Sequence, residues 1–227
     1  MNAYLPSKFL QVALHHSGGN PARLDELLKL LRQLAFKPVV GIDVRKISKG
    51  GLLLLPTRQY KFPFEQDELD FIVNFVSQGN PLFHLSNHPP LTKQDTCLGQ
   101  LLGYRFHSVV KGSDPSRSFE VYPTPHSTSV FDSVDTNQHF SIRNSCIVSY
   151  DNDLFSVIAD FSRSNLSCGD PNAAFGIARP RKLETGAIVA LGDSGLLGEP
   201  TSKNPGPGLH AGDNSELVKR ILRWLRN

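Results

Sequence analysis

The chain has few cysteines, no long apolar run and little net charge, and each shortage excludes a class of protein. Its three cysteines, Cys97, Cys146 and Cys168, are odd in number and widely spaced, and no Cys-x-x-Cys pair occurs. This pattern is typical of free thiols in a reducing compartment, and of neither a disulfide framework nor a zinc site. No apolar run approaches the roughly 20 residues that a membrane span needs. Residues 1–12 lack a basic segment followed by a long apolar one, so we predict no signal peptide and a cytoplasmic location.

The small net charge, +3, argues against a nucleic-acid partner. The basic excess lies partly in Arg179-Pro-Arg-Lys182 and partly in the last predicted helix, where it complements the helix dipole. No aromatic platform for bases accompanies either cluster. We therefore predict a chain that binds no nucleic acid.

Signatures of bound cofactors and metals are also missing. Ser17-Gly-Gly-Asn20 precedes a predicted helix, but it is neither a Walker loop nor a Gly-x-Gly-x-x-Gly fingerprint. Helix N–H groups there could hold an anion, but simple capping is the favoured explanation of the motif. His84 and His88 are four residues apart, roughly 13 Å along a strand, which is too far to share a metal. We expect no cofactor and no metal, with His84 facing the sheet and His88 in a loop.

What the sequence does contain is an alternation of strands and helices typical of an α/β protein. Leucines at helical spacing predict a helix from Asn20-Pro21 to about Ala35, and similar stripes predict helices over Glu65–Ser77 and Ser215–Arg226. We expect Trp224 at the margin of the last helix's apolar side, which should pack beside the first helix. Short apolar runs between the helices predict strands at Phe9–Leu14, Val39–Val44, Leu52–Leu55, Pro81–Leu85 and Ala187–Leu191.

The pattern changes to short β-rich segments between about residues 104 and 178. They are separated by Ser, Asp, Asn and Pro turns, and no linker brackets them. We interpret them as an antiparallel extension of a mainly parallel sheet, within one domain covering residues 1–227. The expected segments are Phe119–Tyr122, Phe140–Ile142, Cys146–Tyr150, Phe155–Phe161 and Phe175–Ala178, the last paired with Ala187–Leu191.

Five pieces, taken in order, resemble a known family. They are Leu52-Leu-Leu-Leu-Pro56, a helix ending at Gln78-Gly79, Leu98-Gly-Gln-Leu-Leu-Gly-Tyr104, Pro125-His-Ser-Thr-Ser-Val130, and a strand ending in Gly192-Asp-Ser194 before a closing helix. This order is similar to the class I glutamine amidotransferase-like domains of unknown function, a type also found in auxiliary proteins of gliding-motility ABC transporters. The resemblance implies a flavodoxin-like, three-layer sandwich.

The chain departs from true amidotransferases where their chemistry takes place. The family's nucleophilic Cys follows the fourth strand, where this sequence has Leu85-Ser-Asn-His88, and its His-Pro-Glu is replaced by Gly192-Asp-Ser194. Cys97 falls in the following helix. Glutaminase chemistry needs an activated thiolate with a His partner, so the resemblance implies a fold without that activity.

The candidate site lies at the carboxyl ends of the strands, where open α/β sheets bind ligands. The favoured hypothesis is a non-catalytic binding or scaffold module that holds a small anionic ligand, with a protein partner or a second copy of the chain as other occupants. The simplest role for Asp193 and Ser194 is to bind neighbouring loop amides. The alternative is a Ser-dependent hydrolase or acyltransferase using Ser86, His88 and Asp193. The expected ligand-binding residues are His15, Ser17, Gly18, Arg58, Asn87, Asp193 and Ser194.

Overall fold

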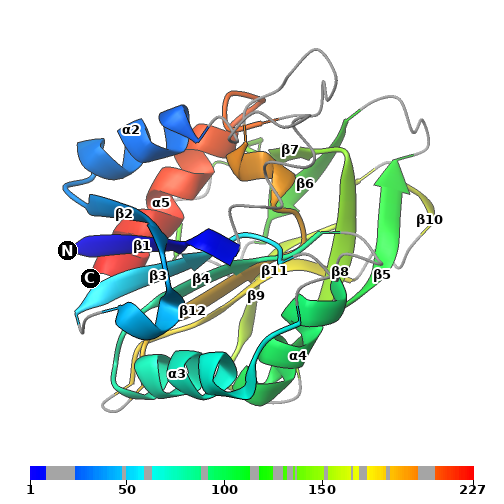
Figure 1. Cartoon of the computed structure of the whole chain (residues 1–227). Helices are drawn as coiled ribbons and strands as arrows, with labels where there is room; N and C mark the ends of the chain where they lie inside the picture. The colour runs from blue at the N-terminus through cyan, green and yellow to red at the C-terminus, as the bar shows by residue number, and fades with distance from the viewer. Residues whose placement is uncertain are drawn as a thin grey trace.

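The computed structural model places helices on both faces of a large mixed β-sheet (Figure 1). None of the helices it describes is long and apolar enough to cross a membrane. The residues that the structure describes are 1–8, 24–47, 50–58, 63–87, 92–112, 118–124, 130–131, 135, 137–150, 153–164, 166–168, 173–182, 185–198 and 208–227.

Five parallel strands form one half of the sheet, in the order β2-β1-β3-β4-β12. β3 and β4 are buried along their whole length, as continuous apolar runs predict. β12 joins β4 although all of the described antiparallel strands, β5 to β11, lie between them in the chain. The bounds are β1 (Asn2–Pro6), β2 (Lys37–Ile42), β3 (Gly51–Leu55), β4 (Leu82–Leu85) and β12 (Ile188–Leu191).

Antiparallel strands form the other half and continue the same sheet beyond β12. β11 lies at the junction, because one of its edges pairs with β12 and the other pairs with β8 and β9. The sheet is therefore mixed, with a larger antiparallel share than the expected extension. The bounds are β5 (Tyr104–Gly112), β6 (Phe119–Pro123), β7 (Phe140–Ile142), β8 (Asn144–Tyr150), β9 (Ser156–Asp160), β10 (Leu166–Cys168) and β11 (Ala174–Arg179).

Among the helices whose bounds the structure describes, two cover each face of the sheet. α2 (Asp25–Gln33) and α5 (Asn214–Arg226) lie side by side on one face, and α3 (Gln66–Ser77) and α4 (Thr92–Leu102) lie on the other (Figure 1). Leu222 and its stripe on α5 are buried in the first core, and Trp224 is half-buried at its margin, as predicted. Arg226 ties α5 to α2 by donating to the carbonyl of Leu34 over 2.8 Å.

The start of the chain holds a strand that the sequence did not predict, and the next strand is shorter than expected. β1 occupies Asn2–Pro6, and the expected strand at Phe9–Leu14 lies outside the described residues. β2 ends at Ile42, two residues before the expected Val44. Gly41 takes a φ of +77°, and the Asp43 carboxylate then accepts the Arg45 amide at 3.0 Å, which starts the short 3-10 helix η1 (Val44–Lys46).

Candidate functional site

Polar residues follow the parallel strands and meet at their carboxyl edge. Thr57 follows β3, Asn87 follows β4, and Asp193 and Ser194 follow β12. The Ser194 hydroxyl accepts a hydrogen bond from the Thr57 hydroxyl at 2.9 Å and another from the Asn87 amide at 3.4 Å. Of the predicted residues, the fold thus brings Asn87 and Ser194 into direct contact, and it adds Thr57 as a second donor to Ser194.

A chain of buried hydrogen bonds lies behind this edge. The Tyr104 hydroxyl is 2.7 Å from Nδ1 of His84, and Nε2 of His84 is 3.4 Å from the Asp95 carboxylate. Ser86 donates to the other Asp95 oxygen at 2.8 Å. The side chains of His84, Ser86 and Asp95 are all fully buried. The Ser86 hydroxyl is therefore held by a carboxylate and not by a histidine base.

Burial sets the proton affinity of the groups in this interior. It raises the pKa of Asp95, and the contacts with His84, the Arg58 amide and Ser86 only partly offset that effect. It also raises the pKa of the Cys146 thiol well above its usual value, with the nearby Asp95 carboxylate adding to the shift. Sγ of Cys146 instead donates to the Gly192 carbonyl at 3.3 Å. This thiol is thus protonated and lacks the thiolate that nucleophilic chemistry requires.

Asp193 is the second buried carboxyl group at the edge. One oxygen accepts the Gly195 amide at 2.6 Å, the loop-amide contact expected from the sequence. Only 4% of the residue is exposed, and burial raises the pKa of its carboxyl to about 7 despite that hydrogen bond. Near neutral pH the group is therefore divided between its charged and uncharged forms.

Arg58 does not extend into the solvent at this edge. It is fully buried, its Nη2 donates to the Glu68 carboxylate at 2.8 Å, and its guanidinium lies 4.1 Å from the centre of the Phe64 ring. Glu68 also accepts Lys8 at 2.9 Å. Burial would raise the pKa of Glu68, but the bonds from Lys8 and Arg58 outweigh it and lower the pKa below its usual value. The charge expected to attract an anion is thus neutralised inside the fold.

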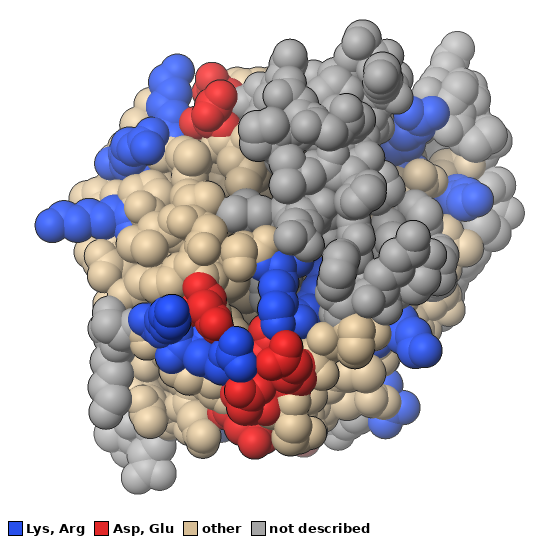
Figure 2. All heavy atoms as spheres, in the orientation of Figure 1, with Lys and Arg blue, Asp and Glu red and all other residues tan. Residues whose placement is uncertain are grey.

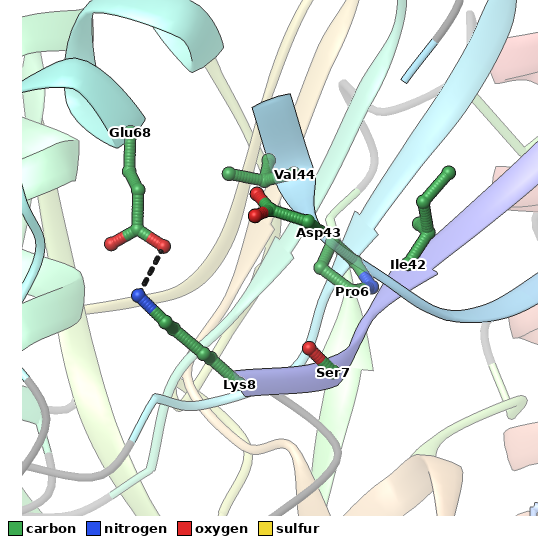
Figure 3. A pocket seen from close by; sticks show the side chains of 7 residues that line it. All are labelled: Pro6, Ser7, Lys8, Ile42, Asp43, Val44 and Glu68. Carbon is green, nitrogen blue, oxygen red and sulfur yellow. Dashed lines mark ion pairs between the residues drawn. The ribbon is translucent and has the colours of Figure 1, made fainter. Parts of the chain in front are cut away.

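A small hollow, partly open to solvent, lies beside this ion pair. Figure 3 shows Lys8 reaching from the end of β1 to Glu68 on α3, with Asp43 on the far side of the opening. The hollow therefore offers one ammonium group and two carboxylates. Its lining is Pro6, Ser7, Lys8, Ile42, Asp43, Val44 and Glu68.

An ion-pair network continues from the hollow onto the surface. Figure 2 shows acidic and basic side chains gathered side by side on this face. Arg45 bridges Asp43, Glu65 and Asp67 at 2.8 to 3.1 Å, and Lys8 joins Glu65 to Glu68. Glu65 is therefore paired with both Lys8 and Arg45, and Glu68 with both Lys8 and Arg58. Exposed pairs of this kind add little stability each.

Several predicted site residues cannot be placed. His15, Ser17, Gly18, Asn20 and His88 lie outside the described residues. The proposed contact of Ser86 or Asp193 with His88 is therefore not observed. Within the described ranges no cluster of three or more His, Cys, Asp or Glu side chains could hold a metal ion.

Sequence reasoning missed Asp95, Glu68 and Lys8. A signal existed for Glu68, because Glu65-Gln-Asp-Glu68 has the spacing of a capping box, and the Glu65 amide donates to Glu68 at 3.0 Å. Asp95 sits in the first turn of α4, where an acid is ordinary helix chemistry. Its contact with Ser86 depends on how α4 packs on the sheet.

Comparison with solved structures supports the fold and goes no further. The N-terminal domain of mmIFT52 has a TM-score of 0.74 at 13% identity, covering 100% of this chain and 98% of that one. A ThuA-like protein from Bacteroides uniformis scores 0.58 at 12% identity (99% and 89% covered). A GMP synthase subunit from Thermoplasma acidophilum scores 0.50 at 15% identity (99% and 94% covered). No protein-family model and no curated protein matches the sequence.

Proposed function

We propose that the chain is a non-catalytic binding or scaffold module with a degenerate amidotransferase-like fold. The strand order β2-β1-β3-β4-β12, with two helices on each face, supports a flavodoxin-like, three-layer sandwich in this part of the chain. The likeness to a ThuA-like protein and to the GMP synthase subunit supports the amidotransferase-like resemblance. The continuous sheet supports a single domain over residues 1–227.

The burial and bonding of Ser86 carry the proposal. Ser86 follows β4, at the position of the nucleophilic Cys in class I glutamine amidotransferases. Its side chain is fully buried, and its hydroxyl donates a hydrogen bond to Asp95. An attacking hydroxyl needs access to substrate and a base that takes its proton. Cys97, the exposed thiol, lies on α4 with its Sγ 3.4 Å from the Lys93 carbonyl. Neither residue is set up for acyl transfer.

An active-site probe tests the absence of catalysis. A fluorophosphonate should leave the wild-type protein unlabelled, with a known serine hydrolase as the positive control. Labelling of the wild type that disappears in Ser86→Ala would contradict the proposal. It would favour the hydrolase or acyltransferase alternative with Ser86, His88 and Asp193.

The proposed ligand is a small anion at the carboxyl edge, held by His15, Ser17, Gly18, Arg58, Asn87, Asp193 and Ser194. Because Glu68 neutralises Arg58, the described donors best suited to this role are the neutral groups of Asn87 and Ser194, both partly exposed. The raised pKa of Asp193 reduces its repulsion of an anion near neutral pH.

Calorimetric titration of nucleotides, phosphosugars and dicarboxylates tests this ligand class. At least one of these compounds should bind the wild type. The double variant Asn87→Ala, Ser194→Ala should bind that compound at least tenfold more weakly. Ser149→Ala, on β8 in the antiparallel half, should leave the affinity unchanged. Equal binding to wild type and double variant would place the ligand elsewhere and refute the edge site.

A further inference from the structure

A second arginine is buried in the described part of the chain without an acidic partner. Arg179 ends β11 and is 9% exposed. Its Nη2 is 3.4 Å from the Gly186 carbonyl, its Nε has no hydrogen-bond partner, and no carboxylate of the described residues pairs with it. A buried charge with so few partners costs folding free energy. The fold therefore keeps a cation here at the expense of stability.

Arg58 shows how the same protein buries an arginine for structural purposes. Both guanidinium groups lie over a phenylalanine ring. The guanidinium carbon of Arg58 is 4.1 Å from the centre of the Phe64 ring, and that of Arg179 is 5.6 Å from the centre of the Phe155 ring. Arg58 pairs with a buried glutamate, whereas the group that acts electrostatically on Arg179 is the hydroxyl of Tyr104. Burial without an acid lowers the pKa of Arg179. Among the described residues, a carboxylate is the partner that Arg179 lacks.

The surroundings of Arg179 fit a partner that supplies both a carboxylate and apolar side chains. Arg181 and Lys182 follow it in the chain and are exposed. The Phe155 ring beneath its guanidinium contacts the Tyr150 ring at 6.2 Å, and Tyr150 and Leu154 are 37% and 39% exposed. Arg179, Arg181, Lys182, Tyr150 and Leu154 together form what we call the Arg179 surface.

The backbone beneath this surface is fixed. Gly186 donates its amide to the Val76 carbonyl at 2.7 Å, and a Cβ added at Gly186 would lie 1.8 Å from the Asn80 carbonyl oxygen. The carbonyl that holds Arg179 is thereby locked against the end of α3. Arg179 is paired with Ile188 at the start of β12, so this surface lies at the opposite end of the strands from the carboxyl edge.

We propose that the Arg179 surface docks an acidic segment of a partner protein, one that carries carboxylates interleaved with apolar side chains. One carboxylate pairs with Arg179, neighbouring acids lie against Arg181 and Lys182, and an apolar side chain covers Tyr150 and Leu154. Complementary charge and exposed apolar area at one place favour such a peptide over a bare anion, which would leave the apolar part uncovered. This interaction is independent of any ligand at the carboxyl edge.

Fluorescence anisotropy with a labelled peptide, Gly-Glu-Phe-Glu-Leu-Glu-Gly, tests the docking. The wild type should bind it, and Arg179→Met should weaken binding at least tenfold. A peptide with Gln in place of every Glu should also bind at least tenfold more weakly. Arg32→Met removes the same charge from the exposed face of α2 and should change the affinity less than twofold.

Three binding results would overturn the docking proposal. They are no binding of the acidic peptide to wild type, equal binding to Arg179→Met, and full displacement of the peptide by millimolar inorganic phosphate. The last result would identify a site for small anions. If no small anion binds at the carboxyl edge but the acidic peptide still binds, only the proposed edge site is refuted.

Thermal unfolding separates a functional arginine from a structural one. Arg179→Met should keep or raise the melting temperature, because it removes a buried charge that has no acid beside it. Arg58→Met should lower the melting temperature, because it leaves Glu68 buried with one cation fewer. A comparable fall in both variants would show that Arg179 is a structural residue and would overturn the proposal.

Discussion

Asp193 shows how one buried carboxyl group couples this fold to pH. Its oxygen accepts a single backbone amide within the described residues, too little to offset the loss of water. The pKa of the carboxyl rises from an ordinary 3.8 to about 7 in the folded protein. A group with a raised pKa stabilises the fold in its protonated form, so its contribution is full below the unfolded value and is lost as pH rises through about 7.

The variant Asp193→Asn should remove this pH dependence. Asn keeps an oxygen for the Gly195 amide but cannot ionise. Between pH 5 and 8 the wild type should lose about 2–3 kcal/mol of unfolding free energy relative to the variant, since each pKa unit is worth about 1.4 kcal/mol. Urea denaturation of both proteins at the two pH values measures the difference. A difference that does not change with pH would contradict the prediction.

Single residues also show where sequence reasoning reached its limit. Asn87 and Ser194 were found because strand ends in a parallel sheet meet at one edge. The Ser86–Asp95 contact and the Arg58–Glu68 pair were not predicted. In each, the acid lies on a helix packed against the sheet, and no sequence period specifies such contacts. A charged residue at a strand end can point into the solvent or into the core, and the residues around it in sequence look the same in both cases.

Two of the three helices predicted from an apolar stripe, α3 and α5, were predicted almost to the residue, whereas the helix expected from Asn20-Pro21 to about Ala35 spans only Asp25–Gln33 in α2. α3 and α5 begin one residue away from the expected positions and end at the expected ones. Such stripes reflect burial on one side of a helix, and burial is what the sequence records best. β1 was missed because its five residues include Asn2 and Pro6 and show neither an alternating pattern nor a continuous apolar run.

Replacing Leu222 by Ala tests how strongly α5 is anchored. Leu222 is fully buried between the helix and the sheet, so truncation should cost about 2–5 kcal/mol. Chemical denaturation measures this loss, and Arg223→Ala, at an exposed position of the same helix, is the control and should change stability little. An unchanged midpoint in Leu222→Ala would mean that α5 is peripheral to the fold.

At the scale of the whole molecule, the shared sheet couples the two halves. β11 is buried along its length and pairs with β12 of the parallel half and with β8 and β9 of the antiparallel half. The β-rich segments were predicted from their short apolar runs and turn residues. Their forked pairing around β11 was not, because strand order depends on contacts between distant segments.

The two halves should therefore unfold together. Trp224, the only tryptophan, reports on the parallel half through α5, and Cys146 on β8 reports on the antiparallel half through its buried thiol. In urea, tryptophan fluorescence and thiol labelling should give the same midpoint. Cys97→Ser and Cys168→Ser, combined, leave Cys146 as the one thiol that can be labelled. Separate midpoints would mean that the chain consists of two domains.

The position of β12 has a consequence for synthesis of the chain on the ribosome. β4 is complete early in translation, but its neighbour β12 is made only after all of the described antiparallel strands, β5 to β11. Until then β4 presents an open edge of apolar residues, the kind of surface that pairs with other chains and recruits chaperones. A nascent chain arrested before Ile188 therefore exposes the apolar edge of β4, and the pairing of β12 with β4 is the event that covers it.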